Sequence, residues 1–225
     1  MERKKKFVAS YSGGKDSILA VYRAIKEGYV PLKLITTYDM ESDHSWFHNI
    51  QEEMLEKVCK AVNIPLLVIK ASGESYASDF EKALTNLKDH GAEVCIFGDI
   101  DIQEHRDWCV ERCENVGIES YFPLWNEARR DLVFEFIDEG FKAMITVVNT
   151  TKINEKYLGK VLAEDVVNQI SLDGADICGE NGEYHTFVFD GPIFAEAVDF
   201  HIDEIVKSEQ RARLTLRCNN EDSVR

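Results

Sequence analysis

The chain has 225 residues, 44% of them apolar and 30% charged, which suits one α/β domain with an appended piece or two small domains. Its 26 basic and 41 acidic side chains give a net charge of −15, which argues against nucleic acid as a partner unless a local basic patch overrides it. No apolar run approaches the length of a bilayer span, so we expect no membrane partner and a cytoplasmic location.

The first 150 residues alternate strand and helix signals. Alternation of this kind implies right-handed crossovers and a parallel sheet covered on both faces, so we predict a doubly wound α/β domain. By apolar periodicity, the predicted strands are 7–11, 31–38, 65–69, 93–98, 118–122 and 142–149, and the predicted helices are 16–27, 46–62, 76–90, 102–116 and 132–139.

After about residue 150 the pattern changes to one more helix at 162–170, a glycine-containing polar stretch, and alternating strand patterns at 186–189 and 202–216. We therefore divide the chain into a first domain of residues 1–150 and a smaller α+β domain of residues 151–225. The apolar segment 194–216 could pair with its copy in a homodimer or fold into a sheet within the chain.

The most distinctive stretch is the glycine-rich turn at residues 11–17, which follows a strand and opens a helix. Two adjacent glycines let the backbone turn sharply around an anion, and the free N–H groups of the helix start point at it. The spacing fits neither the Walker A pattern nor the dinucleotide fingerprint. The alternatives are a phosphate-bearing ligand and a plain strand–helix turn with a serine cap. The groups predicted to hold the phosphates are Ser12, Gly13, Gly14, Lys15 and Ser17.

Two further polar clusters follow predicted strands, where open parallel sheets bind ligands. Thr37 lies in a polar run after the second strand that could hold adenine or ribose. Gly98 and Asp99 follow the fourth strand, and the Asp99 carboxylate could bind Mg²⁺ beside phosphate oxygens. The alternative for Asp99, and equally for Asp101, is capping of the next helix.

The segment at residues 178–186 crowds two glycines, two carboxylates and a histidine into nine residues. It is either a surface turn or a rigid loop that presents Glu180, Glu183 and His185 to a substrate. Carboxylates could bind ammonia or a cationic group, and a histidine can act as acid or base near neutral pH.

Six cysteines occur without any Cys-x-x-Cys pair, so a structural zinc site is not indicated. His105, Cys109 and Cys113 are spaced to share one helix face, which makes a metal-binding stripe conceivable. The alternative is that these cysteines are small buried apolar residues.

The pattern Ser-Gly-Gly-x-Asp-Ser in the turn resembles the PP-loop of ATP pyrophosphatases, which split ATP into AMP and pyrophosphate. Further motifs occur in one order along residues 7–194, and together they resemble the diphthine–ammonia ligase family of that superfamily. These motifs are Gly98-Asp99-Ile100, Pro123-Leu124-Trp125, Leu158-Gly159 and the loop at 179–186. The resemblance implies a ligase that uses ATP and Mg²⁺ to activate the carboxylate of diphthine, a modified histidine on an elongation factor, for displacement of AMP by ammonia.

This resemblance also implies roles for the candidate residues. The serines and glycines of the turn would hold pyrophosphate, and Lys15 would offset its developing charge. Asp16 and Asp99 would hold Mg²⁺. Glu180, Glu183 and His185 would position or deprotonate ammonia or another amine.

The loop also departs from the Glu-Gly-Gly-Glu-Tyr-Glu-Thr of archaeal and eukaryotic members, at Asn181 and His185. Bacterial relatives resemble the present version, and bacteria lack diphthamide, so a bacterial enzyme would use another carboxylate-bearing substrate. Two other readings remain: a PP-loop enzyme of tRNA modification, with Cys178 as a persulfide carrier, and an ATP-binding sensor without turnover.

Overall fold

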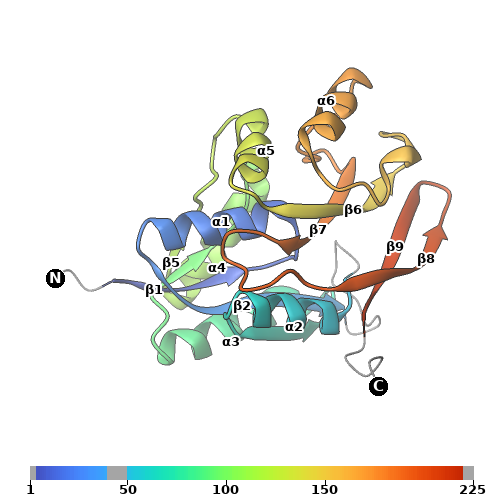
Figure 1. Cartoon of the computed structure of the whole chain (residues 1–225). Helices are drawn as coiled ribbons and strands as arrows, with labels where there is room; N and C mark the ends of the chain where they lie inside the picture. Colours follow the sequence, from blue (N-terminus) through green and yellow to red (C-terminus); the bar gives the residue numbers. More distant parts are fainter. Residues whose placement is uncertain (1–3, 40–49, 220–225) are drawn as a thin grey trace.

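Five parallel strands form the first sheet of the computed structural model, which describes residues 4–39 and 50–219 (Figure 1). Their order, β3-β2-β1-β4-β5, places the first strand in the centre. The strands β2 and β3 are added on one side of it and β4 and β5 on the other, as in doubly wound folds. All neighbouring pairs are parallel. The strands are β1 (Lys6–Ser10), β2 (Val30–Asp39), β3 (Leu66–Ala71), β4 (Val94–Ile96) and β5 (Glu119–Tyr121).

Helices cover this sheet on both faces, which confirms the doubly wound α/β class. In β1, Phe7 and Ala9 pack with α1, α2 and α5, whereas Val8 between them packs with α3 and α4. Successive residues of a strand point to opposite faces, so the sheet has two separate apolar layers. The helices are α1 (Lys15–Lys26), α2 (Glu52–Ala61), α3 (Tyr76–Asp89), α4 (Gln103–Val116) and α5 (Arg129–Asp138).

A second, antiparallel sheet has the order β7-β6-β9-β8. A short 3₁₀ helix, Glu155–Tyr157, and α6 (Glu164–Leu172) lie between β6 and β7 in the chain. The inner face of this sheet shares one apolar cluster with α1 and α2. At this junction the Cys218 thiol lies 3.3 Å from the Met54 sulfur. The two sheets therefore enclose a common core. The strands are β6 (Lys142–Asn149), β7 (Tyr184–Asp190), β8 (Phe200–Lys207) and β9 (Arg211–Cys218).

One predicted strand lies in the other sheet. The sequence assigned residues 142–149 to the parallel domain, but β6 pairs antiparallel with β7 and β9, so that assignment is wrong. The strand is buried on both sides, and a continuous apolar run reads the same in a parallel sheet and in the centre of an antiparallel one. The domain boundary at residue 150 itself stays a prediction.

The other predicted elements are present, with ends shifted by a few residues. Residues 46–49 of the second predicted helix lie outside the described residues, and its described part begins at Glu52. Strands β8 and β9 form a hairpin within the chain, in keeping with the second alternative for residues 194–216, and the homodimer stays a prediction. Within the described ranges, each helix is too short or too polar to cross a bilayer.

Candidate functional site

The glycine-rich turn is held by its own serines. The Ser17 hydroxyl donates to the Gly14 carbonyl over 2.9 Å, and the Ser12 hydroxyl accepts the Gly14 N–H over 3.3 Å. The two hydroxyls also lie 3.3 Å apart. Helix α1 begins directly afterwards, at Lys15, with Gly14 as a cap that has no side chain. The turn is thus set locally, and its own side chains do not cap the start of the helix.

Two glycines of the predicted site are needed for close packing. Gly13 has φ +85°, and a Cβ there would lie 2.7 Å from the Ile50 side chain. A Cβ on Gly98 would lie 2.9 Å from backbone atoms of Asp16 and Ser17. The absence of a side chain at Gly98 therefore lets the end of β4 rest on the first turn of α1.

Strand β7 of the second sheet completes the turn from the other side. The Lys15 N–H donates to the Thr186 hydroxyl over 3.0 Å, and the Val188 N–H donates to the Gly13 carbonyl over 2.9 Å. Thr186 is 2% exposed, so it takes the place of the missing side-chain cap from 171 residues away. The turn and the second sheet form one structure.

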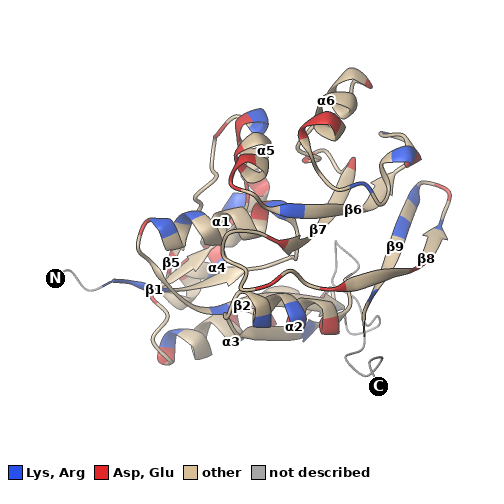
Figure 2. Cartoon of the chain, viewed as in Figure 1, with Lys and Arg blue, Asp and Glu red and all other residues tan. Residues whose placement is uncertain are grey.

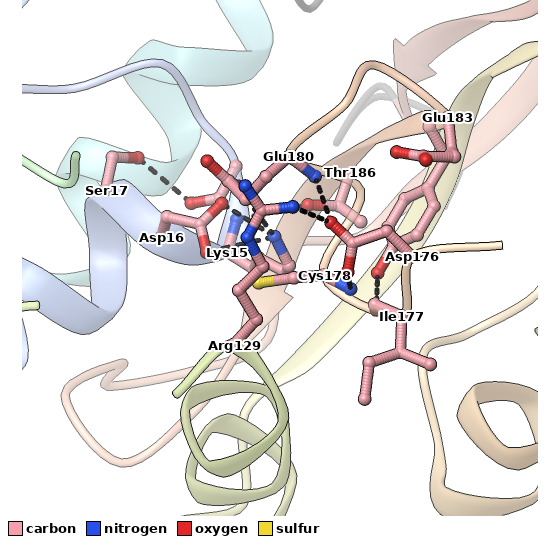
Figure 3. A network of polar contacts seen from close by, with 12 residues as sticks. Lys15, Asp16, Ser17, Arg129, Asp176, Ile177, Cys178, Glu180, Glu183 and Thr186 are labelled. Carbon is pink, nitrogen blue, oxygen red and sulfur yellow. Dashed lines mark hydrogen bonds and ion pairs between the residues drawn. The ribbon is translucent and has the colours of Figure 1, made fainter. Parts of the chain in front are cut away.

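Lys15 lies at the meeting point of the turn and the 178–186 loop (Figure 3). Its buried ammonium is 2.7 Å from Asp16 and 3.9 Å from Glu180, and it sits 5.8 Å from the centre of the Tyr184 ring. Burial is the largest single effect and lowers the pKa of Lys15, but Asp16 and the other nearby groups together outweigh it and raise that pKa well above its usual value. The lysine therefore stays charged.

A cavity of about 560 Å³ opens above these residues. Its lining includes three aromatic side chains, Tyr76, Phe97 and Trp108, besides many polar groups. The cavity brings together most of the predicted site residues. Those that line it are Ser12, Lys15, Asp16, Ser17, Gly98, Asp99, Glu180 and His185.

Asp99 faces this cavity rather than capping a helix. Helix α4 starts after Ile102, which has no side-chain cap, so the capping alternative does not apply. The Asp99 carboxylate lies 3.8 Å from His105 and 3.9 Å from the Cys109 thiol. Burial raises the pKa of Asp99. Asp101, in contrast, pairs through both carboxylate oxygens with Arg129.

Glu180 also faces the cavity, and its surroundings favour the neutral acid. Burial, and then the nearby Asp16 carboxylate, raise the pKa of Glu180 to about 7, against the opposing effect of Lys15. A carboxyl group that titrates near neutral pH can accept or donate a proton under working conditions.

The remaining predicted residues lie outside this lining. Gly13 and Gly14 shape the turn from behind. Glu183 is buried and accepts the Asn181 N–H over 3.1 Å, so it stabilises the loop itself. Thr37 does not line the cavity, but it hydrogen-bonds to Tyr76, which does.

The proposed metal stripe of His105, Cys109 and Cys113 is not the set that comes together. Among the residues that the structure describes, the group whose ligand atoms all lie within 4.8 Å of one another is Asp16, Cys178 and Glu180. Cys109 and Cys113 are buried among apolar residues of the α3–α4 layer.

Four contributors were not assigned a role from the sequence. Thr186 lay in a recognised motif, so its position carried a signal. Tyr76, Trp108 and Arg129 carried none, because an aromatic or a basic residue in a helix is ordinary and gains meaning only from the residues that the fold places opposite it.

Family models match almost the whole chain. The diphthamide synthase N-terminal domain matches residues 5–120, and the diphthamide synthase C-terminal domain matches residues 128–218. Proteins named diphthine–ammonia ligase are among its relatives. The one from Danio rerio is 26% identical in an alignment of 223 positions that covers 88% of this chain and 88% of that protein. The one from Schizosaccharomyces pombe is 24% identical in an alignment of 226 positions that covers 90% of this chain but only 37% of that longer protein.

A solved structure described as a predicted subunit of tRNA methyltransferase from Methanocaldococcus jannaschii covers 84% of this chain and 98% of its own, at 18% identity and a TM-score of 0.45. That likeness is too distant to bear on the site. The family models span both sheets and the cavity between them, and they show to which family the chain belongs. The chain belongs to the diphthamide synthase family.

Proposed function

We propose that the chain is an ATP-dependent ligase that adenylates a substrate carboxylate and then amidates it with ammonia. The observation that carries this proposal is the single cavity in which the phosphate-binding turn meets Glu180 and His185. A nucleotide-binding turn alone would serve a sensor equally well. A titratable carboxyl group beside the turn supplies the acid or base that the amidation step needs.

ATP would lie across the cavity. Its phosphates would lie over the turn at the start of α1, where the Ser12 and Ser17 hydroxyls would exchange their bonds within the turn for bonds to phosphate oxygens. The adenine would stack beside Tyr76 and Trp108, whose ring centres are 5.5 Å apart. Thr37 would then support the adenine pocket through Tyr76.

Mg²⁺ fits the same end of the turn. Asp16 and Asp99 offer carboxylate oxygens to the cavity, which is the donor type that this ion takes together with phosphate oxygens. These two residues would hold the ion, which would neutralise phosphate charge when bound. The carboxylates of Asp16 and Asp99 both line the cavity beside a single lysine, Lys15, which agrees with this role.

In the first step, an oxygen of the substrate carboxylate attacks the α-phosphorus of ATP, and the bond to the bridging oxygen of pyrophosphate breaks. Lys15 offsets the charge that develops on the leaving pyrophosphate, and the glycines and serines of the turn hold it. The buried ammonium of Lys15 is fixed by Asp16 for this task.

In the second step, the nitrogen of ammonia attacks the acyl carbon of the adenylate, and AMP leaves with the bonding electron pair. The nitrogen must lose a proton, which Glu180 accepts as its base or His185 accepts in its place. Glu183 contributes through the loop that carries both groups.

The acceptor follows from the relatives' names. If the chain shares their substrate, it amidates diphthine on an elongation factor. If its host lacks diphthamide, another carboxylate takes that place, and Asn181 and His185 are the loop positions where recognition would differ. We expect nucleic acid to play no part.

The test is incubation with ATP labelled at the α-phosphate, ammonium chloride and a diphthine-bearing elongation factor. We expect AMP, pyrophosphate and an amide in equal amounts, and at least a roughly tenfold loss of AMP formation in Lys15→Ala. Nucleotide binding without AMP under any condition would favour a sensor. AMP formation that depends on tRNA would favour base modification.

A further inference from the structure

We propose that Arg129 is a positioning residue that fixes the Glu180 turn at a set distance from the nucleotide-binding sheet. This inference rests on the proposed function for its chemical consequence, and on contacts of the described residues for its geometry. Arg129 is the first residue of α5 and does not line the cavity. Its effect is exerted through the residues that it holds.

The guanidinium group of Arg129 joins two distant segments (Figure 3). Its Nε and Nη2 donate to both carboxylate oxygens of Asp101, over 2.6 and 2.8 Å. Its Nη1 pairs with Asp176 and reaches the Asn181 side chain over 3.3 Å. Two-pronged contacts of this kind fix direction as well as distance. Asp101 follows the nucleotide-binding strand β4, and Asp176 precedes the loop that contains Glu180.

Asp176 passes this constraint to Glu180. Its carboxylate accepts the Cys178 N–H over 3.0 Å and the Glu180 N–H over 3.2 Å. Between these two, Gly179 has φ +78° and donates its own N–H to the Asp176 carbonyl over 3.2 Å. The backbone of the turn is therefore wrapped around one carboxylate, and a shift of Asp176 would move Glu180 with it.

The charges explain why an arginine is needed. Asp101 and Asp176 approach each other through the single guanidinium between them, and without it two carboxylates would repel across the gap. An uncharged residue would let the two segments separate. A lysine would supply the charge but could not reach both carboxylates with fixed geometry.

Amide hydrogen exchange tests the geometry without any activity. We expect Arg129→Gln to raise the exchange rates of the Cys178 and Glu180 amides by at least about tenfold, with Arg129→Lys between it and the wild type. Arg130→Gln is the matched control, because Arg130 is the next residue of α5, is exposed, and stacks on Phe134. Unchanged exchange in Arg129→Gln, or an equal rise in Arg130→Gln, would overturn the proposal.

Kinetics test the consequence. With ATP, ammonium chloride and diphthine-bearing elongation factor, we expect Arg129→Gln to lower kcat at least about tenfold while the KM for ATP stays within about twofold. If Arg129→Gln does not fold, Asp101→Asn removes one anchor and should give a smaller change in the same direction. An increase in the KM for ATP without loss of kcat would contradict the positioning role. A wild type that forms no AMP would remove the proposed function, and the exchange result would still decide the geometry.

Discussion

The two loops of the site are closed by different local groups and anchored by different neighbours. In the glycine-rich turn, serine hydroxyls bond to neighbours no more than five residues away, and Thr186 and Val188 of β7 add bonds from outside. In the Glu180 loop, the Asp176 and Glu183 carboxylates accept nearby N–H groups, and Arg129 and the Lys152 ammonium hold the loop from outside. Local closure leaves a short motif that can be recognised in a sequence, whereas long-range support leaves scattered residues that cannot.

The first prediction concerns the contact between the glycine-rich turn and the residues that follow β4. Gly98→Ala should have the largest effect, a loss of about 2–3 kcal/mol in the free energy of unfolding and weaker ATP binding, because its Cβ would meet the backbone of α1. Chemical denaturation and calorimetric titration with ATP measure the two effects. Gly140→Ala is the control, since nothing lies within 4 Å of its Cβ and it should lose only the roughly 1 kcal/mol of its positive φ without weakening ATP binding. Equal losses in the two variants would refute the close approach.

Thr186→Val tests whether the second sheet supports the turn. It leaves the Lys15 N–H buried without its acceptor, so we expect a loss of about 2 kcal/mol in unfolding free energy. Thr186→Ser should restore most of it. Thr146→Val is a matched control in the same sheet, because it removes a weaker 3.4 Å contact with the His185 carbonyl. If the control costs as much as Thr186→Val, the capping role is wrong.

Glu180→Gln tests the environment of the Glu180 loop through the pH dependence of the unfolding free energy. The pKa of Glu180 is about 7 in the folded protein and near 4.5 when unfolded, so the folded state binds the extra proton between these values. Stability contributed by the protonated acid is therefore complete below about pH 4.5 and is lost as the pH rises to 7. Relative to the wild type, we expect the variant to gain stability progressively as the pH rises from 4.5 to 8, and to gain nothing at pH 4. Thermal unfolding across this range measures it, and a pH-independent difference would exclude the shifted pKa.

Lys142→Ala should have the smallest effect, below about 0.5 kcal/mol in unfolding free energy. Its ion pair with Asp190 spans 48 residues of sequence but is exposed to solvent. Sequence separation alone does not make a contact important, because water screens this pair and not the contact at Thr186. A denaturation midpoint well below that of the wild type would show that this edge of the sheet matters more than its exposure indicates.

The sequence predicted the fold where elements alternate and each is defined by its own periodicity. It failed at β6, because burial on both sides removes the alternation that tells one sheet type from another. In the site, the residues of the turn were found because backbone requirements for glycine and charge are local. The role of Thr186 and of Arg129 depends on partners far away in sequence, and no spacing rule connects them.

Lys15 and Gly13 bond to Thr186 and Val188, which are made some 170 residues later on the ribosome. The nascent first sheet can gather its helices, but the cavity lacks one wall until β7 has been synthesised and seated. Under the proposed function, nucleotide binding would therefore report completion of the second sheet: a chain that is truncated or misfolded there would neither trap ATP nor cleave it unproductively.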